Sequence, residues 1–156
     1  MNQRPSREGL AMSDILTLKS RRVVFPDGER PATLTLADGW IRSIDDYDED
    51  ARIDYGNKAI LPGLIDTHVH FNEPGRAEWE GWRTGTTAAL AGGVTTVVEM
   101  PLNSIPSTVD LASLQSKLAS TTGQLYCDVG LWGGAVPGNS HQLKDLVRGG
   151  VLGLKA

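Results

Sequence analysis

After Pro62 the sequence alternates between short apolar runs that are typical of strands and longer amphipathic runs that are typical of helices. Strand-like runs end at His70 and then cover 94–100, 125–132 and 151–155. Helical patterns lie between them, at 78–91, from about 108 to 118 and at 139–147. Strands separated by helices predict a parallel sheet with right-handed crossovers, and four such units are half of a (β/α)8 barrel. The fold class predicted for 61–156 is therefore α/β, the front half of a TIM barrel.

The helix boundaries follow from capping residues and from the spacing of apolar positions. In the first helix the glycines at 92 and 93 should end the segment, and one face collects the bulky positions Trp79, Trp82, Thr86, Ala89 and Leu90. In the second, Ser107 or Thr108 is the expected cap, Asp110 lies in the first turn, and the buried face is predicted to hold Leu111, Leu114 and Leu118.

Residues 14–60 carry strand and turn signals instead. Short β-like runs at 15–18 and 22–25 are followed by an alternating run at 33–36, and Asp38-Gly39 is a strong hairpin signal before 40–44. This segment is predicted to form part of a small β-sandwich domain. Residues 1–13 are polar and are expected to be a disordered leader, with Met12 as an alternative start.

Composition excludes several classes of partner and location. A net charge of -4 gives no electrostatic reason for binding nucleic acid or an anionic membrane. No apolar run approaches the ~20 residues of a membrane span. The single cysteine, Cys127, excludes an intrachain disulfide and fits a reducing compartment, so a cytoplasmic location is expected. Because Cys127 lies in an apolar segment, we expect a buried, inert thiol.

The pattern His68-Val69-His70 follows the apolar run 59–67. Histidines two apart on a strand point to the same face, and at the carboxyl end of a barrel strand that face looks into the mouth of the barrel. Imidazole is a common ligand for zinc, so the pair could be part of a catalytic metal site. For the pattern alone, histidines satisfied by neighbouring carbonyl groups are the favoured alternative.

The surrounding segments resemble a known family. LPGLIDTHVH at 61–70 resembles the first barrel strand of the amidohydrolase superfamily, and FNEPGRAEWEG at 71–81 with GGVTTVVEMPLNSIP at 92–106 resembles the allantoinases within it. The resemblance begins at about residue 14 and matches only the front part of that family. It implies a metal-dependent cyclic amidohydrolase that hydrolyses the hydantoin ring of allantoin to allantoate in purine catabolism.

The same resemblance implies roles for three residues. His68 and His70 would bind the more buried of two divalent metal ions, with zinc the expected metal. Lys155, at the end of the apolar run 150–155, would be carbamylated by carbon dioxide and bridge the two ions. Desolvation lowers the pKa of a lysine and frees the neutral amine for this reaction, although a structural lysine would extend to solvent instead.

The family also requires two more histidines and a general-base aspartate from later strands, and 1–156 holds none of the three. His141 is interpreted as a surface residue. We therefore expect this chain alone to be inactive. We also expect it not to be a stable monomer, because a half barrel leaves an open sheet edge. The resemblance implies a homotetramer for the full-length enzyme.

Substrate choice rests on the loops after the first two barrel strands. Dihydroorotases usually carry arginine where Asn72 stands, which suits a substrate carboxylate, whereas an amide suits a neutral cyclic ureide. Asn103 and Ser104 could contact substrate or form a turn. The alternatives are a dihydroorotase, a hydantoinase or dihydropyrimidinase, and a non-catalytic amidohydrolase-like assembly partner.

Overall fold

The computed structural model describes residues 15–156, which form two compact units, one up to Pro62 and one over Gly63–Ala156. The expected leader at 1–13 lies outside the described residues. Each unit has its own apolar core, and each is considered by itself. Within the described residues, no helix combines the length and the apolar character that crossing a membrane requires.

The first unit is a single four-stranded sheet in the order β3-β2-β1-β4. Its strands are β1 (Leu16–Phe25), β2 (Gly28–Ala37), β3 (Trp40–Asp45) and β4 (Ile53–Asp54). The two runs expected at 15–18 and 22–25 join in β1, with a register shift between Ser20 and Val23. The described residues thus supply one sheet of the predicted sandwich. The Asp38-Gly39 hairpin is confirmed, since both residues have positive φ.

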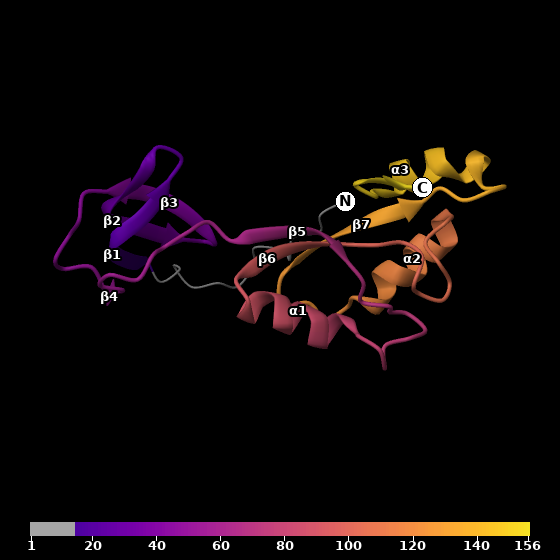
Figure 1. Cartoon of the computed structure of the whole chain (residues 1–156), viewed down its shortest axis with the longest axis horizontal. Helices are drawn as coiled ribbons and strands as arrows, with labels where there is room; N and C mark the ends of the chain where they lie inside the picture. The colour runs from indigo at the N-terminus through magenta and orange to yellow at the C-terminus, as the bar shows by residue number, and fades with distance from the viewer. Residues whose placement is uncertain (1–14) are drawn as a thin grey trace. The chain divides into compact units, whose positions relative to one another are not determined.

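The second unit alternates strand and helix, as predicted. It contains β5 (Leu64–Val69), α1 (Trp82–Ala91), β6 (Val94–Glu99), α2 (Leu111–Ser120), β7 (Asp128–Gly134), the 3₁₀ turn η1 (Ser140–Gln142), α3 (Leu143–Gly149) and β8 (Gly153–Lys155). The strands pair in parallel in the order β5-β6-β7-β8. Figure 1 shows the helices following the strands in turn along the chain. The α/β prediction of a partial barrel is confirmed.

The core of this unit lies between the sheet and its helices. Its buried members contact one another and are Phe71, Trp82, Val97, Leu114, Leu131, Leu146 and Val151. Phe71 and Trp82 meet edge to face, with ring centroids 5.4 Å apart. The core therefore reaches from α1 and α2 to the residue directly after His70.

The start of α1 differs from the prediction. The helix begins at Trp82 and not at Glu78. The backbone N–H of Trp82 has no partner within the helix, and it donates instead to the Glu73 carboxylate at 2.9 Å. Trp79 lies before the helix and is 64% exposed, and Leu90 is 45% exposed, so the prediction that these two belong to the buried face is wrong. Gly92 follows the helix end, as expected.

The cap and buried face of α2 also differ. Asp110 is the N-cap, and its side chain accepts from the Ser113 amide at 2.8 Å. Thr108 lies in the preceding loop, where its backbone bonds to Pro101 and Gly134. The buried face is Ser113, Leu114 and Lys117, whereas Leu111 and Leu118 are exposed. A buried lysine, and not a leucine, completes the face.

Candidate metal centre

His68 and His70 project to the same side of the first barrel strand. Their ring centroids lie 5.4 Å apart with the planes tilted by 57°, and both side chains are exposed. Two imidazoles that share one zinc ion at about 2.0–2.1 Å place their centroids roughly 5 Å apart, so this spacing fits a common metal ion. The same-face prediction is confirmed. His68 lies on β5, and His70 directly follows its last residue.

Lys155 ends β8 at the opposite edge of the sheet from β5. The pairing places Gly153 beside Trp132 and Lys155 beside Gly134, so the side chains of Trp132 and Lys155 point to the same face. The Lys155 side chain is exposed. The desolvation expected of a reactive lysine here is therefore not provided by residues 15–156, and carbamylation of Lys155 stays a prediction.

Trp132 links the two strands that carry these residues. Its indole Nε1 donates to the Thr67 carbonyl oxygen at 2.9 Å, and Thr67 directly precedes His68. A Cβ built on Gly153 would overlap the six-membered ring of the same indole. One side chain therefore contacts both edges of the sheet, next to His68 and two residues before Lys155. Over residues 15–156, no three His, Cys, Asp or Glu side chains group to hold a metal ion, so the histidines stand as a pair.

Asn72 occupies a constrained position two residues after His70. Its φ is +57°, its side chain is 6% exposed, and its Oδ1 has no hydrogen-bond partner among the described residues. A buried amide oxygen without a partner is costly, so this atom is available to a ligand donor. Its role in substrate binding stays a prediction.

Asn103 and Ser104 lie in the loop after β6. Ser104 is buried and donates through Oγ to the Pro106 carbonyl at 3.1 Å, which is the turn-forming alternative raised by the sequence. Asn103 is half-buried, and its carbonyl accepts from Arg76 Nη1 at 3.4 Å. Substrate contact by either side chain stays a prediction.

The loops after β5 and β6 contact each other. The Ile105 amide donates to the Pro74 carbonyl at 2.8 Å. A Cβ on Gly75, where φ is +96°, would lie 2.6 Å from Ile105 Cβ. The loops after β5 and β6, about thirty residues apart in sequence, therefore pack together close to His70 in the chain. Asn72 lies in the first of these loops and Asn103 in the second.

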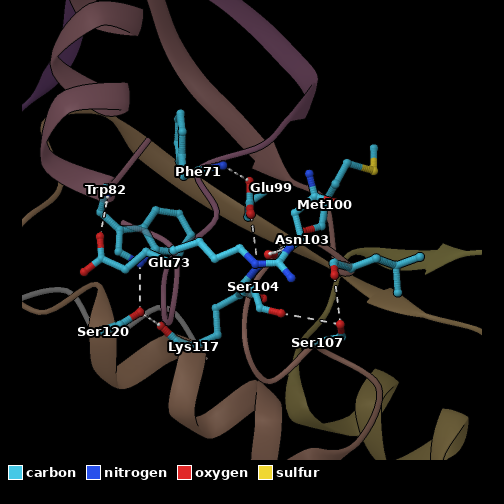
Figure 2. A network of polar contacts seen from close by, with 12 residues as sticks. Phe71, Glu73, Trp82, Glu99, Met100, Asn103, Ser104, Ser107, Lys117 and Ser120 are labelled. Atoms are coloured by element: carbon cyan, nitrogen blue, oxygen red, sulfur yellow. Dashed lines mark hydrogen bonds and ion pairs between the residues drawn. The ribbon is translucent and has the colours of Figure 1, made fainter. Parts of the chain in front are cut away.

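A buried ion pair lies beneath this loop (Figure 2). Lys117 Nζ and Glu99 Oε1 are 3.0 Å apart, and the other oxygen of Glu99 accepts from the Phe71 amide at 2.8 Å. Burial lowers the pKa of Lys117, and Glu99 opposes that shift. The sequence interpretation missed this pair, although a glutamate inside a β-branched strand and a lysine three residues after Leu114 were its signals.

His141 and Cys127 are the two remaining residues for which the sequence supports an expectation, and neither is expected to bind metal. His141 lies in η1 and is exposed, as expected for a surface residue. Cys127 is half-buried, and burial together with Asp128 raises the pKa of its thiol. A raised pKa keeps the thiol protonated and unreactive.

Comparisons with known proteins show the family of the chain. Residues 59–148 match the amidohydrolase family. The chain is 48% identical over 151 residues to the allantoinase of Streptomyces avermitilis, covering 93% of this chain and 34% of that protein. It is 59% identical over 96 residues to the allantoinase of Saccharomyces cerevisiae, covering 62% of this chain and 21% of that protein.

Among solved structures, the L-hydantoinase (dihydropyrimidinase) from Arthrobacter aurescens is similar, with a TM-score of 0.77 and 28% identity. The alignment covers 90% of this chain and 32% of that structure. The chain therefore spans about a third of the length of relatives that it matches over most of its own length.

Proposed function

The chain belongs to the amidohydrolase family. We propose that it is part of an allantoinase, an enzyme that hydrolyses the amide C–N bond of the hydantoin ring of allantoin and yields allantoate. The observation that carries this proposal is the His68–His70 pair at the carboxyl end of β5, with ring centroids 5.4 Å apart. The allantoinases among the relatives support the choice of substrate.

His68, His70 and Lys155 would hold two divalent ions, with zinc as the expected metal. Lys155 would contribute an anionic ligand as the carbamate that its amine forms with carbon dioxide, with release of a proton. When bound, the ions would lower the pKa of water to near neutrality and polarise the scissile carbonyl. The pairing of β7 with β8 supports this role, because it sets Lys155 on the same face as Trp132, whose indole reaches the carbonyl oxygen of the residue before His68.

The remaining residues bind and orient substrate. Asn72 offers an amide donor and the unpartnered Oδ1 as acceptor, a set that suits a neutral ureide better than a carboxylate. Asn103 and Ser104 border the same loop, and the Ser104 hydroxyl holds its shape. The Trp132 indole reaches the carbonyl oxygen of Thr67, the residue before His68, and so adds an aromatic ring to this face of the sheet.

We further propose a cytoplasmic homotetramer. The single thiol, Cys127, stays reduced in that compartment, and the tetramer follows from the family resemblance. Light scattering of the complete gene product would measure the assembly.

The test is hydrolysis by the complete gene product, purified with zinc, on allantoin, a 5-substituted hydantoin and dihydroorotate. We expect allantoin to have the highest kcat/KM and expect a chelator to abolish turnover. Preference for the hydantoin would assign a hydantoinase, and preference for dihydroorotate would overturn the role given to Asn72. Absence of turnover on all three would favour an assembly partner.

A further inference from the structure

The backbone of His70 is held from both sides by two consecutive residues, Glu99 at the end of β6 and Met100 directly after it. The Met100 amide donates to the Val69 carbonyl at 2.9 Å, and the Phe71 amide donates to Glu99 Oε2 at 2.8 Å. These bonds fix the peptide groups before and after His70. The imidazole direction depends on that backbone, because a strand residue projects perpendicular to its sheet.

Lys117 contacts both Glu99 and Met100. Its ammonium group contacts Glu99 Oε1 at 3.0 Å and donates to the Met100 carbonyl at 3.2 Å. The side chains of Glu99 and Lys117 are 0% and 1% exposed, so the contact is shielded from water. Figure 2 shows the chain of contacts from α2 through Glu99 to Phe71.

A buried ion pair is a poor choice if packing is its only purpose. Taking both charges out of water costs several kcal/mol per ion, and apolar side chains of similar volume often give equal or greater stability. Unlike an apolar side chain, the Glu99 carboxylate accepts a hydrogen bond from the Phe71 amide. Its position is in turn set by Lys117.

We propose that Glu99 and Lys117 are positioning residues for the metal ligand His70, with Glu99 acting through the Phe71 amide and Lys117 orienting the Glu99 carboxylate. This inference rests on the proposed function, because it takes His70 as a ligand. Groups behind the ligands of a metal site typically change metal affinity by about 10–100-fold when they are removed.

The test compares the complete gene product with three variants. The double variant Glu99→Leu/Lys117→Met removes both charges together and keeps the volume apolar. Glu99→Gln keeps an acceptor for Phe71 but removes the charge that pairs with Lys117. Ser120→Ala is the matched control, because Ser120 accepts from Trp82 Nε1 and donates to the Lys117 carbonyl without contacting Glu99.

The readouts are Tm of the metal-free protein and Co²⁺ affinity, measured by chelator competition and visible absorption. We expect the double variant to unfold near the wild-type temperature yet to bind Co²⁺ at least about tenfold more weakly. The Co²⁺ affinity of Glu99→Gln should lie between those of the wild-type protein and the double variant. Ser120→Ala should have a lower Tm but the wild-type Co²⁺ affinity. Wild-type affinity in the double variant would overturn the proposal.

Two further results separate the possible failures. If the wild-type protein binds no Co²⁺, the proposed function fails and this inference fails with it. If it binds Co²⁺ and the double variant binds equally well, only the inference fails. If the variants do not fold, hydrogen exchange in the wild-type protein tests the proposal instead. The Phe71 amide should be protected from exchange, and rapid exchange there would contradict its hydrogen bond to Glu99.

Discussion

Trp132 Nε1 donates to the Thr67 carbonyl oxygen at 2.9 Å, although Trp132 lies on β7, Thr67 on β5, and β6 runs between them. The indole therefore crosses the open face of the sheet. Its six-membered ring also fills the space above Gly153, which lies two residues before Lys155. This one side chain therefore contacts both the strand of His68 and the strand of Lys155.

Trp132→Phe should weaken that link while it keeps most of the apolar ring. The lost hydrogen bond should lower the unfolding free energy by about 1 kcal/mol. It should also lower kcat/KM for allantoin, because Thr67 precedes His68 in the chain. Urea unfolding and steady-state kinetics of the complete gene product measure the two effects. An unchanged kcat/KM in Trp132→Phe would contradict the link.

Asn72 combines a left-handed backbone with an unpartnered amide oxygen, and two substitutions separate these properties. Asn72→Gly keeps the positive φ but removes the amide, so we expect near wild-type stability and a kcat/KM at least about tenfold lower. Asn72→Ala removes the amide and adds backbone strain of about 1 kcal/mol. Thermal unfolding and allantoin hydrolysis of both variants are the measurements. Full activity in Asn72→Gly would exclude substrate contact by the amide.

Lys155→Ala should abolish turnover and lower the metal content, because the bridging group is lost. Short carboxylic acids added to this variant should restore part of the activity by taking the place of the carbamate. Metal analysis and activity against acetate or propionate concentration are the measurements. Two ions per subunit in Lys155→Ala would contradict the bridging role.

The barrel strands and the histidine pair could be predicted from sequence because each depends on short-range periodicity. The alternation after Pro62 predicts β5 to β8, and two-residue spacing places His68 and His70 on one face. The Asp38-Gly39 turn is equally local. Such features need no knowledge of which segments meet.

The errors arise where a distant residue decides local structure. Glu73 sets the start of α1 by accepting the Trp82 amide, nine residues further along the chain. Lys117 takes a position that a helical pattern assigns to an apolar residue, because Glu99 on β6 pairs with it. Trp132 gains its role only when the sheet brings Thr67 within reach. Single residues such as Glu99 and Lys117 carry a local signal, but which residues pair with each other is decided by the fold.

The Asp110 cap of α2 predicts a pH dependence of stability. The hydrogen bond from the Ser113 amide lowers the pKa of Asp110 below its ordinary value of 3.8. Because the folded pKa is the lower one, the charged cap adds stability that is fully present well above pH 3.8 and is lost as pH falls through the folded value. Asp110→Ala should lower the unfolding free energy by about 1 kcal/mol at pH 7.

That difference should shrink on acidification. Asp110→Asn is the matched variant, since a neutral amide oxygen still caps the helix but does not titrate. Urea unfolding of the three proteins between pH 7 and the acid limit of folding measures the effect. A gap between wild type and Asp110→Asn that stays constant at every pH would show that the carboxylate contributes no charge-dependent stability.

Gly85→Ala compares two opposing effects on stability: the higher helix propensity of alanine in α1 and the overlap of its Cβ with Phe71. Alanine in a helix interior is ordinarily more stable than glycine by about 1 kcal/mol. Here the added Cβ would overlap Phe71 Cδ1 and Cε1, and Phe71 is 5% exposed and packed against Trp82.

Overpacking of a core typically costs about 1–3 kcal/mol, so we expect Gly85→Ala to lower stability despite the gain in helix propensity. Displacing Phe71 should also weaken Co²⁺ binding, because its amide holds the backbone next to His70. Gly92→Ala is the control: its Cβ would approach no atom closer than 3.4 Å, so its unfolding free energy should stay within about 0.5 kcal/mol of wild type. A more stable Gly85→Ala protein would mean that Phe71 can move aside, and that the core does not fix the position of His70.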